Sequence, residues 1–181
     1  MFNSIKALKK NGFEGFESVE YYIDPAHKKK IPNDKGGVYL VLLPEGSKID
    51  FNIKNSAGIR GERNPTVLIE ELEQNWVSDT LVLYIGKAKK FKERIHCYLK
   101  HGMGSDSAAH WGGRMIWQVK DSQNLLFCWK KSDKVDSFED ERELINSFCE
   151  FYKKRPFANH TGGGKILKAF AKKEFPKNKI L

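Results

Sequence analysis

The chain has 181 residues, carries a net charge of +9, and is 40% hydrophobic and 12% aromatic. This length favours one domain over two, and this content of apolar and aromatic residues argues against a disordered chain. The excess of lysine and arginine favours an anionic partner, with nucleic acid first and a membrane surface second, although a soluble protein that is merely basic has the same balance.

The first expected element is an N-terminal arm or helix within residues 1–35, which ends in a turn-rich stretch. The sequence GVYLVLL at 37–43 is typical of a buried strand, because its residues are β-branched, aromatic or otherwise apolar. Residues 45–80 are polar and turn-rich. We interpret them as an insertion that contains one short helix in VLIEELEQNWVSD at 67–79.

A second strand and a basic helix follow the insertion. The strand is TLVLYIG at 80–86, and the helix is KKFKERIHCYLKHG at 89–102. Within the helix, Phe91, Ile95 and Leu99 recur at four-residue spacing, which places them on one apolar face.

The second half of the chain begins with the glycine-rich loop GMGSDSAAHWGG at 102–113. Two strands joined by a turn are expected next, RMIWQV at 114–119 and NLLFCWK at 124–130. The clearest helix is SFEDERELINSFCEFYKKR at 137–155, because acids crowd its first turn and its apolar residues form one stripe. Residues 161–181 form a basic C-terminal segment.

These elements together predict an α+β fold, a single domain with a small, mainly antiparallel central sheet flanked by helices. The three cysteines, Cys97, Cys128 and Cys149, form no paired motif, so we expect a reducing, cytoplasmic environment. We expect no signal peptide and no membrane span, because no apolar stretch has the required length.

Five short motifs follow one another along the chain. Any one of them could occur by chance, but all five in this order form a fairly specific pattern. GVY at 37–39 and YIG at 84–86 lie on consecutive predicted strands, Arg94 on the next helix, Glu141 on a later helix, and Asn159 just past it. In this order they resemble the GIY-YIG nuclease family, and YIGKAKKFKERI is especially similar to the nuclease domain of bacterial excision-repair enzymes. The resemblance covers roughly residues 36–160, the expected nuclease core with its insertion.

The resemblance implies a metal-dependent endonuclease that hydrolyses phosphodiester bonds in DNA. It implies that Glu141 holds one Mg²⁺ or Mn²⁺ per active site and that Arg94 binds the scissile phosphate. It further implies that Tyr39 and Tyr84 activate the attacking water, with Tyr39 as general base. A tyrosine, whose ordinary pKa is about 10, would need help from nearby cations such as Lys87.

The same resemblance assigns roles to three more residues. Asn159 corresponds to an asparagine that supports the site by hydrogen bonding, and Tyr98, one helical turn after Arg94, would be a proton shuttle. Gly86 would allow a tight turn close to the substrate. Among the clustered acids of the last helix, the pattern ExxLI selects Glu141.

A further set of basic and aromatic residues is expected to bind nucleic acid: Lys87, Lys89, Lys90, Lys92, His110, Trp111 and Arg114. Trp111 would stack on a base or wedge into a duplex, or else cover the core; both readings stay open. Taken singly, each residue also has a structural explanation, such as a half-buried core tyrosine or a solvated lysine. The order and spacing of the whole set favour the functional interpretation.

The spacing between the two tyrosine motifs is longer than in the family, whose members usually join these motifs by a short hairpin.

Restriction, mobile-element and repair enzymes all stay open as the biological setting. DNA is the expected partner, RNA stays open, and dimerisation would be one route to specificity. The alternatives are a catalytically silent nucleic-acid-binding module on the same fold, and a basic protein that binds a protein partner.

Overall fold

The structure is a computed structural model that describes residues 1–59, 61–105, 112–132 and 137–159. Its centre is a four-stranded sheet in the order β1-β4-β2-β3. The strands are β1 (Glu14–Ser18), β2 (Gly37–Leu42), β3 (Val82–Ala88) and β4 (Leu126–Lys131). Every pairing in the sheet is antiparallel. The expected α+β domain with a mainly antiparallel sheet is therefore confirmed.

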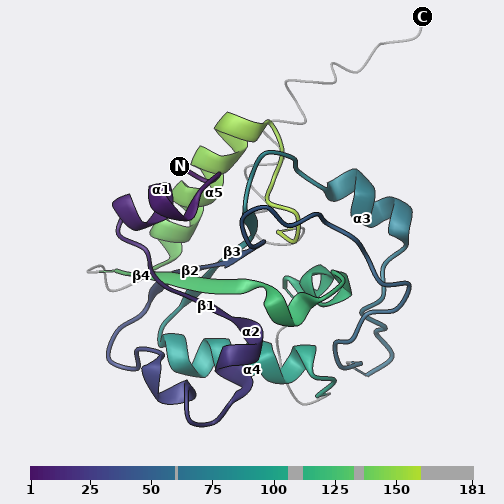
Figure 1. Cartoon of the computed structure of the whole chain (residues 1–181), viewed down its shortest axis with the longest axis horizontal. Helices are drawn as coiled ribbons and strands as arrows, with labels where there is room; N and C mark the ends of the chain where they lie inside the picture. The colour runs from purple at the N-terminus through teal and green to yellow at the C-terminus, as the bar shows by residue number, and fades with distance from the viewer. Residues whose placement is uncertain (60, 106–111, 133–136, 160–181) are drawn as a thin grey trace, which may run out of the picture.

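Helices cover both faces of this sheet (Figure 1). On one face lie α1 (Ile5–Lys10) and α5 (Phe138–Tyr152), and on the other lie α2 (Val19–Ile23) and α4 (Phe91–Gly102). The helix α3 (Ile69–Asn75) lies to the side of the sheet, within the insertion. Short 3-10 turns complete the described chain: η1 (Lys28–Lys30), η2 (Arg114–Gln118) and η3 (Ser122–Asn124).

The alternation of side chains along β2 explains the two layers. Val38, Leu40 and Leu42 join the apolar cluster that contains Phe148 of α5. Tyr39 lies between them in sequence and joins the cluster on the α4 side. Successive side chains of a strand point to opposite faces, so a strand buried on both faces is apolar throughout.

Most of the predicted helices and strands are found at the predicted positions, and one predicted strand is wrong. The stretch 114–119 is not a strand but the 3-10 helix η2, preceded by Gly113 in a left-handed conformation with φ of 78°. Its residues Met115, Ile116, Trp117 and Gln118 are all buried, so the burial shows no strand alternation. Strand β1, which no sequence pattern had indicated, pairs with β4 and makes the N-terminal residues part of the sheet.

The insertion is tied to the domain by the buried side chain of Gln118. The N–H of Val67 donates to Gln118 Oε1 at 2.9 Å, and Gln118 Nε2 donates to the carbonyls of Val67 at 2.7 Å and Asn52 at 3.0 Å. Because buried amides must be satisfied, these bonds fix the path of the insertion beside η2. In the described part of the chain, no helix combines the length and the apolar character that crossing a membrane requires.

Candidate active site

Two tyrosines meet inside the domain where β2 and β3 pair. Tyr39 of β2 lies opposite Gly86 of β3, and their register places the rings of Tyr39 and Tyr84 with centroids 5.9 Å apart. Tyr39 has 0% of its surface exposed and Tyr84 has 6%. Of the two, Tyr84 is therefore the one nearer to solvent.

Gly86 makes room for these rings, which corrects the expected tight turn. It lies within β3 and not in a turn. A Cβ atom at this position would lie 2.6 Å from Cζ of Tyr39 and 2.7 Å from Cε1 of Tyr84. These separations are well below van der Waals contact, so only glycine allows both tyrosines to occupy their positions.

Arg94 joins the two tyrosines from α4. Its side chain forms hydrogen bonds with the hydroxyls of Tyr39 and Tyr84, which also hydrogen-bond to each other. Within the described residues, Nε of Arg94 is a buried donor without a hydrogen-bond partner. A planar guanidinium is also the side-chain group whose geometry matches phosphate oxygens.

Burial dominates the acid–base behaviour of both tyrosines. Desolvation raises the pKa of Tyr39 well above 10, and the nearby Arg94 charge offsets this only in part. Desolvation also raises the pKa of Tyr84, against the lowering effect of Arg94. The expected lowering of a tyrosine pKa by neighbouring cations is therefore not found, and both hydroxyls are protonated at neutral pH.

Tyr98 packs behind the pair and is fully buried. Its hydroxyl donates to the carbonyl oxygen of Gly113 at 3.2 Å, and its ring stacks on Tyr84 with centroids 6.1 Å apart. A Cβ atom on Gly113 would lie 3.1 Å from Cε2 of Tyr84. The close approach of Gly113 to the Tyr84 ring was not predicted, although the adjacent glycines at 112–113 were a possible signal for it.

Glu141 approaches the site from α5, on the other face of the sheet. Its side chain is 20% exposed, and its Oε2 lies 3.9 Å from Nζ of Lys87. The charge of Glu141 raises the pKa of Tyr84, so the two side chains are within electrostatic reach. Nζ of Lys87 also lies 3.8 Å from the centroid of the Phe138 ring, which places Lys87 beside the carboxylate rather than beside the tyrosine hydroxyls.

Asn159 fixes the outer edge of β3 next to the YIG motif. The N–H of Ile85 donates to Asn159 Oδ1 at 2.9 Å, and Asn159 Nδ2 donates to the carbonyl of Ile85 at 2.7 Å. The neighbouring N–H of Ala158 donates to the carbonyl of Leu83 at 2.9 Å. Because β3 is the last strand of the sheet, these bonds replace those of a missing neighbour strand.

Replacing Asn159 with alanine should release this edge. The Asn159→Ala variant leaves both backbone groups of Ile85 without their partner, so we expect a loss of about 2–3 kcal/mol in the free energy of unfolding. Amide hydrogen exchange should accelerate at Ile85 before it does so at Leu40 on the paired strand β2. The exposed Asn124→Ala variant serves as control and should change neither; equal exchange at Ile85 in all three proteins would contradict the assigned role.

A divalent metal fits the chemistry of Glu141 only as a largely hydrated ion. Within the described residues, no group of three or more His, Cys, Asp or Glu side chains could hold a metal ion. Mg²⁺ is commonly bound through one or two carboxylates while it keeps several waters. One partly buried carboxylate within electrostatic reach of Tyr84 is consistent with that mode of binding.

The residues expected to contact nucleic acid fall into separate places. Nζ of Lys90 contacts Oε1 of Glu93 at 3.0 Å, Lys89 is exposed, and Arg114 begins η2 with its pKa lowered by burial. Lys92 lines a cleft on another flank of α4. The predictions for His110 and Trp111 lie outside the described residues.

Comparison of the chain with family models, with curated proteins and with solved structures finds no significant match in any of the three. The GIY-YIG resemblance therefore stays a prediction that rests on the motif residues.

Proposed function

We propose that the protein is a metal-dependent endonuclease of the GIY-YIG type that hydrolyses phosphodiester bonds in DNA. One observation carries this proposal: Arg94 is hydrogen-bonded to both motif tyrosines at a strand edge that Asn159 fixes and that Glu141 approaches from the opposite face of the sheet. A structural tyrosine cluster needs neither an arginine beside it nor a carboxylate within reach.

The mechanism assigns a task to each side chain. Arg94 binds two oxygens of the scissile phosphate and stabilises the charge that develops on them. Tyr84, nearer to solvent, orients the attacking water, and Tyr39 holds the hydroxyl of Tyr84 from behind. The complete burial of Tyr39 favours this division over Tyr39 as the base that contacts water.

Glu141 would hold the cation, Mg²⁺ or Mn²⁺, as its one carboxylate ligand among the described residues. When bound, such an ion stabilises negative charge on the phosphate and on the leaving oxygen. The three cysteines of the described structure are free thiols, which supports a cytoplasmic location within this proposal.

The second candidate is a catalytically silent nucleic-acid-binding module on the same fold. It is favoured by the raised tyrosine pKa values, because a protonated and buried hydroxyl is a poor base. The two candidates share phosphate binding at Arg94 and differ only in whether a bond breaks.

Incubation with supercoiled plasmid separates the two candidates. We expect nicked or linear DNA with Mg²⁺ or Mn²⁺ and intact plasmid with chelator. Discrete bands would indicate sequence specificity, and a smear would indicate a loosely specific or structure-directed enzyme. No cleavage of single-stranded DNA, duplex DNA or RNA by the folded protein would favour the binding module.

A further inference from the structure

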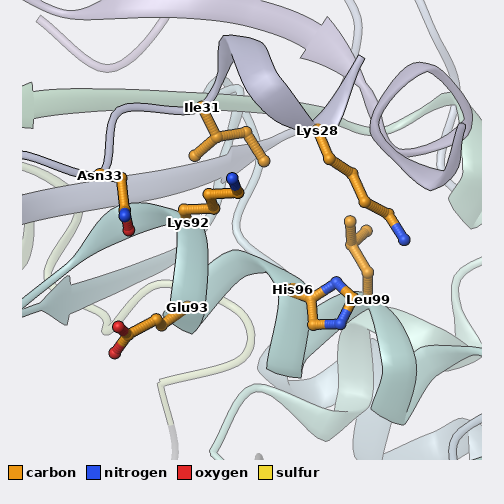
Figure 2. A pocket seen from close by; sticks show the side chains of 7 residues that line it. All are labelled: Lys28, Ile31, Asn33, Lys92, Glu93, His96 and Leu99. Carbon is orange, nitrogen blue, oxygen red and sulfur yellow. The ribbon is translucent and has the colours of Figure 1, made fainter. Parts of the chain in front are cut away.

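A second basic feature lies on α4, away from the tyrosines. A cleft of about 320 Å³ opens between the η1 segment and the first turns of α4 (Figure 2). Its lining residues are Lys28, Ile31, Asn33, Lys92, Glu93, His96 and Leu99. Side chains of this cleft have no role in the site described above.

A backbone hydrogen bond joins the two walls of the cleft. The N–H of Lys92 donates to the carbonyl of Pro32 at 3.1 Å, which ties the start of α4 to the segment after η1. Ile31 and Leu99 are almost completely buried and form an apolar floor. The cleft is therefore part of the packed domain and does not depend on the position of a loose loop.

Its charge is positive because its one acidic side chain is engaged elsewhere. Glu93 contacts Nζ of Lys90 at 3.0 Å and points away from Lys28 and His96 (Figure 2). In the same view Lys28 extends from η1 toward α4, on which Lys92 and His96 lie. Two ammonium groups and an imidazole thus surround an opening with an apolar floor.

The imidazole of His96 responds to this surrounding charge. Burial and the charges of Lys28, Lys100 and Lys92 lower its pKa, whereas Glu93 is paired with Lys90. His96 is therefore neutral at pH 7 and can donate one ring N–H to an anion. Binding of an anion would oppose the lysine charges and raise this pKa again.

The cleft and the candidate active site lie on opposite flanks of α4. Arg94 follows Lys92 by two positions and precedes His96 by two, which corresponds to a rotation of about 200° around a helix. The two groups are thus separated by roughly the width of a helix, about 10 Å. One phosphate cannot contact both.

We propose that this cleft binds a second backbone phosphate of the nucleic acid, held by Lys28, Lys92 and His96. The inference rests on the proposed nucleic-acid substrate and adds where the strand is held outside the cleavage site. The start of α4 would then bind one phosphate on each of its two flanks, an arrangement that we call the clamp.

Binding of a fluorescein-labelled DNA duplex without metal tests the proposal, because nothing is cleaved in chelator. The double variant Lys28→Gln/Lys92→Gln should bind about 10-fold more weakly at moderate salt. The slope of log affinity against log salt should fall by about 1, the loss expected for one phosphate contact. The control is Lys6→Gln/Lys10→Gln on α1, which removes the same charge on the other face of the sheet.

An equal change in both double variants would overturn the proposal, since it would show a general effect of net charge. Cleavage separates this result from the proposed function. If the slope falls by about 1 in Lys28→Gln/Lys92→Gln while the unchanged protein cuts no DNA, the second phosphate site is supported and the nuclease proposal is wrong. Normal cleavage with an unchanged slope would remove the clamp alone.

A histidine NMR titration supplies a readout at the cleft itself. A short oligonucleotide should raise the pKa of His96, and the shift should be absent in Lys28→Gln/Lys92→Gln. Inorganic phosphate at the same phosphate concentration should give a smaller shift. If inorganic phosphate alone shifts His96 and DNA does not, the cleft binds a free anion and the proposal is wrong.

Discussion

Glu141→Gln should reduce DNA cleavage by at least about 100-fold and leave DNA binding in chelator unchanged. The substitution keeps the size of the side chain and removes the charge that would hold a divalent cation. Even groups one step further from a metal contribute about 10–100-fold to affinity or activity, so loss of the ligand itself should cost no less. Plasmid nicking rates at several Mg²⁺ concentrations provide the measurement.

A matched control lies on the same helix. Glu143 is exposed, two residues further along α5, and Glu143→Gln removes an identical charge. We expect its cleavage rate to stay within about two-fold of the unchanged protein, because surface charge changes have small effects. Equal losses in the two variants would mean that Glu141 acts through the general field of α5 and not as a ligand.

Arg94→Ala completes the test from the other face of the sheet. Removing one donor aimed at developing charge typically costs about 10²–10³-fold in rate, and we expect a loss in that range. Near-ultraviolet circular dichroism should check that the tyrosine cluster survives, because Arg94 also holds the two hydroxyls. Cleavage by a folded Arg94→Ala protein at the unchanged rate would exclude the proposed site.

Local pattern was enough to predict most of the elements that carry the site. The apolar run of β2, the period of α4 and the acidic first turn of α5 all agree with the positions found. These signals lie within one element, so they need no knowledge of the remaining chain. Register then brings Tyr39 and Tyr84 together once β2 and β3 pair.

Features that depend on distant partners could not be predicted in this way. The stretch 114–119 is apolar and β-branched enough for a strand, but none of the strands in the described ranges pairs with it. An isolated bridge joins Val119 to Phe51, and the residues of the stretch fill the space beside α4. β1 was missed because its glycine and acids are poor strand formers, and only its pairing with β4 makes it a strand.

For the candidate active site too, the residues could be predicted from the sequence, but their contacts could not. The sequence identified Tyr39, Tyr84 and Arg94 but could not show that burial outweighs the cation in setting the tyrosine pKa values. It named Asn159 as a support but not its bonds to Ile85. It placed Lys92 in one nucleic-acid-binding set with the other basic residues, whereas helix phase sends Lys92 toward η1 and Arg94 toward the sheet.

Gly86→Ala should destabilise the protein by about 3 kcal/mol and abolish cleavage, the largest structural effect that we expect. The added methyl group would lie 2.6 Å from Cζ and 2.7 Å from Oη of Tyr39, and 2.7 Å from Cε1 of Tyr84. Both rings belong to a packed cluster with Tyr98, so neither can turn away freely. Overpacking of this kind typically costs 1–3 kcal/mol, and two rigid rings place the change at the upper end of about 3.

Urea denaturation of two further variants shows whether Gly86→Ala destabilises the protein through a steric clash or through a change in backbone freedom. Gly46 has a φ of +78° and no atom within 4 Å of an added Cβ, so Gly46→Ala should cost only about 1–2 kcal/mol, from its left-handed backbone. In the Gly86→Ala background, Tyr39→Leu removes two of the three clashing atoms. The double variant should therefore be less destabilised than the sum of its single changes, by about 1 kcal/mol or more. Strictly additive effects would mean that Gly86 is required for some reason other than the tyrosine rings, and the geometric basis of the motif glycine would have to be abandoned.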